Sequence, residues 1–271
     1  MNILDEIIAH KHKEVAERKA LYPEKLLEKS LYFETACLSM ERYLLRPDKS
    51  GIIAEIKRKS PSKGDINPYV SVERTSIGYM QAGASALSIL TDLTFFGGKN
   101  EDLITARKYN YCPILRKDFT VDEYQILEAK SIGADAILLI AAALPAKRVN
   151  ELASFARSLG LEVILEVHNL EELQETYCPE VNVVGVNNRN LKTFKTDVGL
   201  SFELAQHIPA GVTKISESGL SQPKTLMELK EAGYNGFLIG ETFMTSSRPE
   251  QAAARFIKEL KALQDKKEVV A

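Results

Sequence analysis

The sequence lacks the features that mark membrane, secreted and nucleic-acid-binding proteins. Its longest uninterrupted apolar stretch runs from Ala136 to Leu144 and stops at Pro145, whereas a membrane-spanning helix needs about 20 residues. The segment MNILDEIIAHKHKEVAERK is charged almost from its start and has no apolar signal core. Lys and Arg number 35 against 37 Asp and Glu, a net charge of −2, so the basic excess of a general nucleic-acid binder is missing. We therefore expect a cytoplasmic protein that uses neither a membrane nor a nucleic acid.

Cysteine and histidine are also sparse. The three cysteines are widely spaced and form no C-x-x-C pair (Cys37, Cys112 and Cys178), which argues against a disulfide framework or a zinc site. His10 and His12 are two residues apart and would diverge on a helix, while His168 and His207 are isolated. We expect these histidines to be structural or solvated, and we expect neither a metal nor a cofactor.

What remains is ordinary globular composition, with 45% hydrophobic and 27% charged residues over 271 positions. That balance excludes a fibrous, collagen-like or largely disordered chain. The length suits one large α/β domain, since barrels of that class run to about 250 residues. We expect residues 1–271 to form a single domain. The sequence does not fix the oligomeric state, and a monomer is compatible with it.

From residue 52 onward, short apolar runs alternate with amphipathic helical segments. Near-continuous apolar runs are typical of strands buried on both faces of a parallel sheet. Eight such strands alternating with helices predict a (β/α)8 barrel. The predicted strands are 52–57, 86–92, 113–119, 136–142, 162–167, 183–188, 213–218 and 236–241.

A weak internal repeat supports the barrel. The segments AGASALSIL, IGADAILLI and AGYNGFLIG each end a helix with a glycine, which can adopt the left-handed helix-ending conformation, and then enter a strand. An open doubly wound sheet is the alternative. It usually carries G-x-G-x-x-G after its first strand, and none follows IIAEIK.

Residues 1–50 precede the eight units and form an N-terminal helical extension. Ile3, Leu4, Ile7 and Ile8 make an apolar stripe at helical spacing. We expect a helix packed on the barrel. A structural plug and a lid over the active site are equally compatible with the pattern.

Charged residues close several predicted strands, where barrel enzymes place their chemistry. Alternation puts Glu55 and Lys57 on one side of the first strand, Lys117 closes the third and Glu166 the fifth. Buried charges are costly unless paired, so these could be salt bridges that stiffen the rim. Four of them at the catalytic end favour function instead: a lysine can donate a proton and a glutamate can accept one.

Three further residues lie next to these charges. Phe119 follows Lys117 on the same side of the strand, Asn187 ends the sixth strand, and Arg189 comes just after it.

Glycines after the seventh and eighth strands predict a phosphate site. Ser218-Gly219 and Gly240-Glu241 lie in the two loops that form the recurring phosphate site of this barrel class. Glycine lets an anion approach the backbone, and Glu241 would contribute its N–H because its carboxylate would repel phosphate. The loops 57–69, which contains Ser60, and 187–197 are polar and could fold over the ligand. These features predict a phosphorylated small molecule as substrate.

At this point the sequence resembles a known family, indole-3-glycerol phosphate synthase. The segments that carry the resemblance are IIAEIKRKSPSKGDI, ILRKDF, LEVHNLEEL, GVNNRNL, ISESGL and GFLIGE, all in family order over nearly the whole chain. Because no second barrel follows residue 271, the chain resembles the monofunctional form.

The resemblance implies a carboxy-lyase of tryptophan biosynthesis. Such an enzyme closes the indole ring of 1-(2-carboxyphenylamino)-1-deoxyribulose 5-phosphate, with loss of CO2 and water, to give indole-3-glycerol phosphate. No cofactor or metal is implied.

The resemblance also implies roles for individual residues. Lys117 matches the general acid, Glu166 the base, Lys57 a lysine that contacts substrate anions, and Glu55 its acidic neighbour; the motif does not fix how the four divide the work. Asn187 matches a residue that orients polar groups, and Arg189 one that supports charge. The matched substrate contacts are Ser60 for the anthranilate carboxylate, Phe119 for the aromatic ring, and Ser218, Gly219, Gly240 and Glu241, with Leu238 nearby, for the phosphate.

Two other functions stay open at this stage. A phosphoribosyl isomerase would use the same phosphate site but needs a different acid–base pair from the Glu and Lys that end the first strand. A catalytically silent barrel would have lost a catalytic residue, and none is lost.

Overall fold

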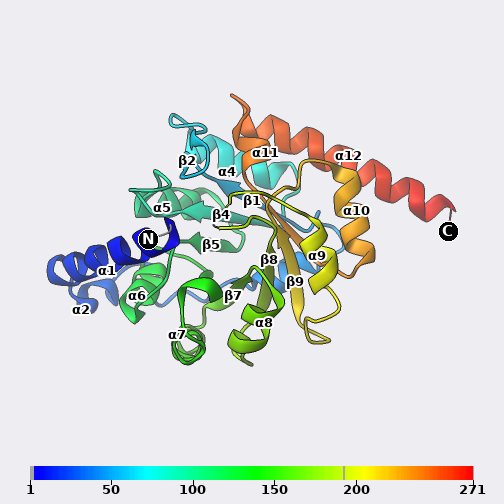
Figure 1. Ribbon diagram of the computed structural model, residues 1–271. Helices are drawn as coiled ribbons and strands as arrows, with labels where there is room; N and C mark the ends of the chain where they lie inside the picture. The colour runs from blue at the N-terminus through cyan, green and yellow to red at the C-terminus, as the bar shows by residue number, and fades with distance from the viewer. Residues whose placement is uncertain (1–2, 192, 271) are drawn as a thin grey trace.

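The computed structural model describes residues 3–191 and 193–270, and its centre is a closed barrel of parallel strands (Figure 1). β1 pairs with β4 on one side and β10 on the other, which closes the ring. This confirms the predicted (β/α)8 barrel and its eight strands. The barrel strands are β1 (Ile52–Ile56), β4 (Ala86–Leu90), β5 (Ile114–Lys117), β6 (Ala136–Ile140), β7 (Glu162–Val167), β8 (Val183–Asn187), β9 (Thr213–Glu217) and β10 (Gly236–Ile239).

Helices surround the barrel on the outside (Figure 1). They are α4 (Val72–Gln81), α5 (Asn100–Tyr109), α6 (Glu123–Ser131), α7 (Ala146–Ser158), α8 (Leu170–Thr176), α9 (Gly199–Leu204), α10 (Pro223–Glu231) and α12 (Pro249–Val270), with the short η1 (Ala141–Ala143) after β6 and α11 (Glu241–Met244) after β10. The repeat glycines do end helices as predicted: Gly83, Gly133 and Gly233 have φ of 101°, 88° and 90°. A side chain there would strain the backbone.

Two apolar layers hold the barrel together. The larger lies between the strands and the helices. The smaller fills the barrel interior with inward-facing residues such as Ile53, Leu115, Ile164 and Ile215. Among the helices that the structure describes, none is long and apolar enough to cross a membrane.

The N-terminal extension consists of α1 (Ile3–Leu21), α2 (Glu24–Leu27) and α3 (Met40–Leu44), of which α1 and α3 contact opposite ends of the barrel. Met40 and Leu44 of α3 are buried in the interior layer and close the bottom. Ile3, Leu4 and Ile7 of α1 line a cavity at the opposite end. Two different helices therefore contact the two ends of the barrel: α3 fills the bottom, and α1 lines the cavity at the opposite end.

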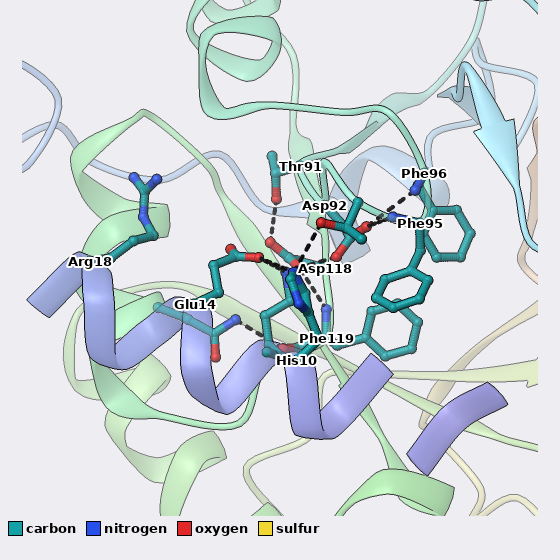
Figure 2. A network of polar contacts seen from close by, with 12 residues as sticks. His10, Glu14, Arg18, Thr91, Asp92, Phe95, Phe96, Asp118 and Phe119 are labelled. Atoms are coloured by element: carbon teal, nitrogen blue, oxygen red, sulfur yellow. Dashed lines mark hydrogen bonds and ion pairs between the residues drawn. The ribbon is translucent and has the colours of Figure 1, made fainter. Parts of the chain in front are cut away.

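A buried lysine of α1 forms ion pairs with the segments that follow β4 and β5. Lys11 has no solvent exposure, and its Nζ lies 2.9 Å from Asp92, 3.0 Å from Asp118 and 3.0 Å from Glu14. Figure 2 shows the side chains of these three carboxylates, Glu14, Asp92 and Asp118, close together beside α1. Asp92 also accepts the backbone N–H groups of Phe95 and Phe96.

One segment departs from expectation. The loop 57–69 contains a small antiparallel hairpin, β2 (Lys59–Ser60) and β3 (Gly64–Asp65). Its base is fixed because the carbonyl of Arg58 accepts the N–H groups of Ile66 and Asn67, and the Arg58 guanidinium forms an ion pair with Asp102 of α5. The polar composition of the loop gave no sign of this hairpin.

Candidate active site

A cavity of about 850 Å³ opens at the carboxyl ends of the barrel strands. Every site residue predicted from the sequence lines it: Glu55, Lys57, Ser60, Lys117, Phe119, Glu166, Asn187, Arg189, Ser218, Gly219, Leu238, Gly240 and Glu241. The structure therefore brings the whole predicted set together in one place.

Strand alternation builds the charged floor of this cavity. Lys117 lies two residues after the interior Leu115, and Glu166 two after Ile164. Residues i and i+2 of a strand point the same way, so each charged side chain stands one step above the apolar barrel interior. The floor is polar because the inward-facing positions change from apolar to charged at the strand ends.

Lys117 is the centre of the floor. Its Nζ donates to Glu166 Oε2 at 2.7 Å and to Glu217 Oε2 at 2.8 Å. Burial would lower the pKa of Lys117, but the two carboxylates outweigh it and hold the pKa above its usual value. Burial likewise opposes ionisation of Glu166, yet Lys117 and His168 hold the pKa of Glu166 well below its usual range. Lys117 is protonated and Glu166 ionised.

Glu217 is a site residue that the sequence reasoning missed. It is 2% exposed, and burial together with the charge of Glu166 raises its pKa to about 7. Gly185 of the neighbouring strand leaves room for it, because a Cβ there would collide with the Glu217 carboxylate. The sequence could have identified Glu217, because in the segment ISES it follows the inward-facing Ile215 by two residues. The same alternation identified Glu55.

Glu55 and Lys57 form a second ion pair beside the first. Lys57 Nζ lies 2.9 Å from Glu55 Oε1, and Ser88 donates to the other carboxylate oxygen at 3.1 Å. The structure gives a reason for glycine at position 240 that is separate from access for a phosphate. A Cβ there would stand 2.6 Å from Glu55 Oε1.

Ion pairs join the polar loops around the cavity. Arg189 donates to Glu241 at 3.1 Å and to Ser62 at 3.3 Å, and Lys63 lies 3.4 Å from the same glutamate. Asn187 accepts the backbone N–H of Arg189 at 3.0 Å. The Glu241 carboxylate thus points toward the basic side chains of other loops.

The loops after β9 and β10, where the sequence predicts a phosphate site, line the cavity, and we call them the anion cradle. Ser218 and Gly219 both adopt left-handed conformations, with φ of 68° and 74°. Gly240 caps α11, whose first turn presents N–H groups that have no partner within the helix. Thr242 donates to the carbonyl of Leu220 at 3.0 Å and ties the two loops together.

An apolar wall faces the cradle. The rings of Phe96 and Phe119 are 5.8 Å apart, and Leu238 and Ile140 line the same cavity. Ser60, on β2, shares a 3.4 Å hydroxyl contact with Ser62. The cavity therefore combines the loops of the anion cradle, aromatic and aliphatic side chains, and paired acidic and basic groups.

Comparison with known proteins agrees with this arrangement. Residues 4–259 match the family model described as indole-3-glycerol phosphate synthase. The chain belongs to the indole-3-glycerol phosphate synthase family. A relative from Bacteroides thetaiotaomicron with that name is 49% identical over 95% of this chain and 98% of its own length. Another, from Magnetococcus marinus, is 43% identical over 95% and 98%.

Solved structures that are more distant in sequence share the fold. An N-acetylmannosamine-6-phosphate 2-epimerase from Clostridium perfringens has a TM-score of 0.58 at 17% identity, covering 82% of this chain and 97% of its own. A chain of the tryptophan synthase complex from Pyrococcus furiosus has a TM-score of 0.56 at 15% identity, covering 79% and 99%. At these identities the likeness concerns the barrel alone.

Proposed function

We propose that the protein is an indole-3-glycerol phosphate synthase, a carboxy-lyase that converts 1-(2-carboxyphenylamino)-1-deoxyribulose 5-phosphate to indole-3-glycerol phosphate. The observation that carries the proposal is the position of Lys117. A buried ammonium group held by two glutamates lies in one cavity with an anion cradle and an aromatic wall.

Lys117 acts as the general acid in this proposal. When the ring carbon that bears the carboxylate attacks the ribulose ketone, negative charge develops on the ketone oxygen. A protonated lysine at that oxygen stabilises the charge and supplies the proton. Its raised pKa keeps the lysine protonated before the reaction begins.

Glu166 acts as the base for the steps that follow. Loss of CO2 returns the bonding electrons to the ring and needs no base. The dehydration that follows removes the hydroxyl formed from the ketone oxygen together with a proton from the adjacent carbon, and the ionised Glu166, which lies beside Lys117, accepts that proton. The Glu55–Lys57 pair completes the set, with Lys57 near the substrate anions. Glu217 accepts a hydrogen bond from Lys117 and, with its pKa raised to about 7, can hold either charge state at neutral pH.

The two ends of the substrate would be held separately. We assign the phosphate to the backbone of Ser218, Gly219, Gly240 and Glu241. The anthranilate ring would pack on Phe119 and Leu238, and its carboxylate would meet Ser60, while Asn187 and Arg189 orient the polar middle. We also propose that the chain works in the cytoplasm as a single domain, on a free small molecule.

The test is turnover by Lys117→Ala. We expect a folded protein with no measurable formation of indole-3-glycerol phosphate, while the matched variant Lys147→Ala, at a side chain that is 89% exposed, keeps wild-type turnover. If Lys117→Ala retained a tenth or more of the wild-type rate, Lys117 would not be the acid.

A further inference from the structure

His168 lies directly beside Glu166 but outside the substrate cavity. It follows Glu166 by two residues at the end of β7, so the two side chains point the same way. The His168 side chain is 8% exposed, and its Nε2 lies 3.4 Å from Glu166 Oε1. That nitrogen is buried and makes no hydrogen bond to another described residue in this conformation. The carboxylate oxygen it faces is the one that Lys117 leaves free.

Glu172 holds the other side of the imidazole. Its Oε2 lies 3.1 Å from His168 Nδ1 and accepts the His168 backbone N–H at 2.8 Å. Asn169 caps α8 by accepting the N–H of Glu172, and its amide donates to Glu172 Oε1 at 2.8 Å. Glu172 is therefore fixed at the helix start by contacts that do not need the imidazole. The helix cap explains why a glutamate stands at position 172. It does not explain why the imidazole of His168 lies between Glu172 and Glu166.

We propose that His168 is a positioning residue for the reaction: as an imidazolium gripped by Glu172, it orients Glu166 and keeps that carboxylate ionised while Lys117 gives up its proton. The inference rests on the proposed function, in which Lys117 is the acid and Glu166 the base. It adds a second cation behind the base that never touches the substrate.

Charge balance explains why a second cation is needed. When Lys117 donates its proton it becomes neutral, and Glu166 loses its counter-ion. Glu166 would then lie near Glu217 of β9 without the positive charge that Lys117 of β5 supplied. The pKa of Glu166 would rise as a result. The imidazolium, held from α8 by Glu172, keeps one positive charge on Glu166 throughout.

The charge state of His168 supports this. Burial alone would lower the pKa of His168, but Glu166 and Glu172 outweigh it and raise the pKa to about 9. The imidazole is therefore cationic at neutral pH, when a histidine in water would be mostly neutral. Above about pH 9 the ring loses its proton and Glu166 loses this support.

The experiment compares His168→Asn with His207→Asn, the same change at an exposed histidine. We expect His168→Asn to lower kcat about tenfold or more and to change KM less than threefold, because the cavity lining does not include His168. We expect wild-type kcat to fall above about pH 9. In His168→Asn that alkaline limb is lost, and an acid limb appears at higher pH than in the wild type because the pKa of Glu166 rises. His207→Asn keeps the wild-type kcat, KM and pH profile.

Glu172→Gln is the conservative partner. It keeps the cap and the imidazole but removes one of the two carboxylates that raise the pKa of His168, so we expect the alkaline limb of kcat to move to lower pH. If His168 had a purely structural role, the alkaline limb of the kcat–pH profile would stay in place. The variants would then lose kcat only to the extent that their thermal midpoints fall. That result would overturn the inference, as would a kcat of His168→Asn within twofold of wild type.

The two proposals fail differently in this assay. Absence of turnover by the folded wild type would refute the proposed function. An active wild type with an inactive Lys117→Ala, combined with unaltered pH profiles in His168→Asn and Glu172→Gln, would refute the role of His168 alone.

Discussion

Replacing the buried Lys11 of α1 by methionine should strongly destabilise the protein. The lysine is fully buried, and its ammonium group lies within 3.0 Å of Asp92, Asp118 and Glu14. Methionine preserves most of the volume but removes the charge, so the buried Asp92 and Asp118 lose the ammonium group that neutralises them. Breaking a buried pair in this way typically costs about 3–5 kcal/mol.

Asp118 supplies an independent scale for this cost. Burial would raise the pKa of Asp118, but Lys11 and Arg116 hold it at about 2, against an ordinary 3.8. The lowering of this pKa corresponds to about 2–3 kcal/mol of folding free energy. Because the folded-state pKa is depressed, this stability is fully present above pH 3.8 and is lost as pH falls toward 2. In Lys11→Met, Arg116 still lowers the pKa of Asp118 and so keeps part of this stabilisation. We therefore expect the total loss of folding free energy to stay near about 3–5 kcal/mol.

The assay is thermal and denaturant unfolding at pH 7 with Lys13→Met as the control, since Lys13 is on the same helix with its side chain 76% exposed. We expect Lys11→Met to lower the free energy of unfolding by about 3–5 kcal/mol and the midpoint by about 10 °C. The control should stay within about 0.5 kcal/mol. The gap between Lys11→Met and wild type should narrow below about pH 4, where the stranded carboxylates become neutral. A loss under about 1 kcal/mol at pH 7 would refute the reasoning.

Three further changes test the site. Glu217→Gln should lower kcat at least tenfold yet leave the thermal midpoint at pH 8 equal to or above wild type. The reason is that the raised pKa of Glu217 costs stability as pH rises from 4.5 through about 7; a lower midpoint with normal kcat contradicts this. Gly219→Val should raise KM at least tenfold, because φ is 74° and a Cβ would stand 2.5 Å from Thr196; titration of inorganic phosphate as a competitive inhibitor checks that the cradle is lost. Lys57→Ala should raise KM by weakening contact with substrate anions, and an unchanged KM counts against that role.

The sequence predicted the parts of the fold that depend on local pattern. The eight apolar runs, the helix-ending Gly83, Gly133 and Gly233, and the charged ends at Lys117 and Glu166 all follow from periodicity and chain geometry. Alternation was enough to place these charges on the inside, because a parallel barrel allows only one inward face per strand.

Other features depend on contacts between distant segments. Lys11 lies in the run HKHKEVAERK, which has the charge pattern of a solvated helix face, and its three carboxylate partners include two from other elements. The hairpin at Lys59–Ser60 is set by hydrogen bonds to Arg58 rather than by strand-like residues. His168 was expected to be structural or solvated, but its ion pairs with Glu166 and Glu172 appear only once β7 and α8 are in place.

The most direct test of the central claim is turnover by the purified protein. We would mix it with 1-(2-carboxyphenylamino)-1-deoxyribulose 5-phosphate and excess EDTA and follow indole fluorescence, against a low background because the chain contains no tryptophan. The account predicts turnover at about 0.1 s⁻¹ or faster, which includes the ordinary enzyme range of about 1–10³ s⁻¹. A folded protein that gives no indole signal would contradict it, and the barrel with its phosphate cradle would then belong to an isomerase or to a silent scaffold.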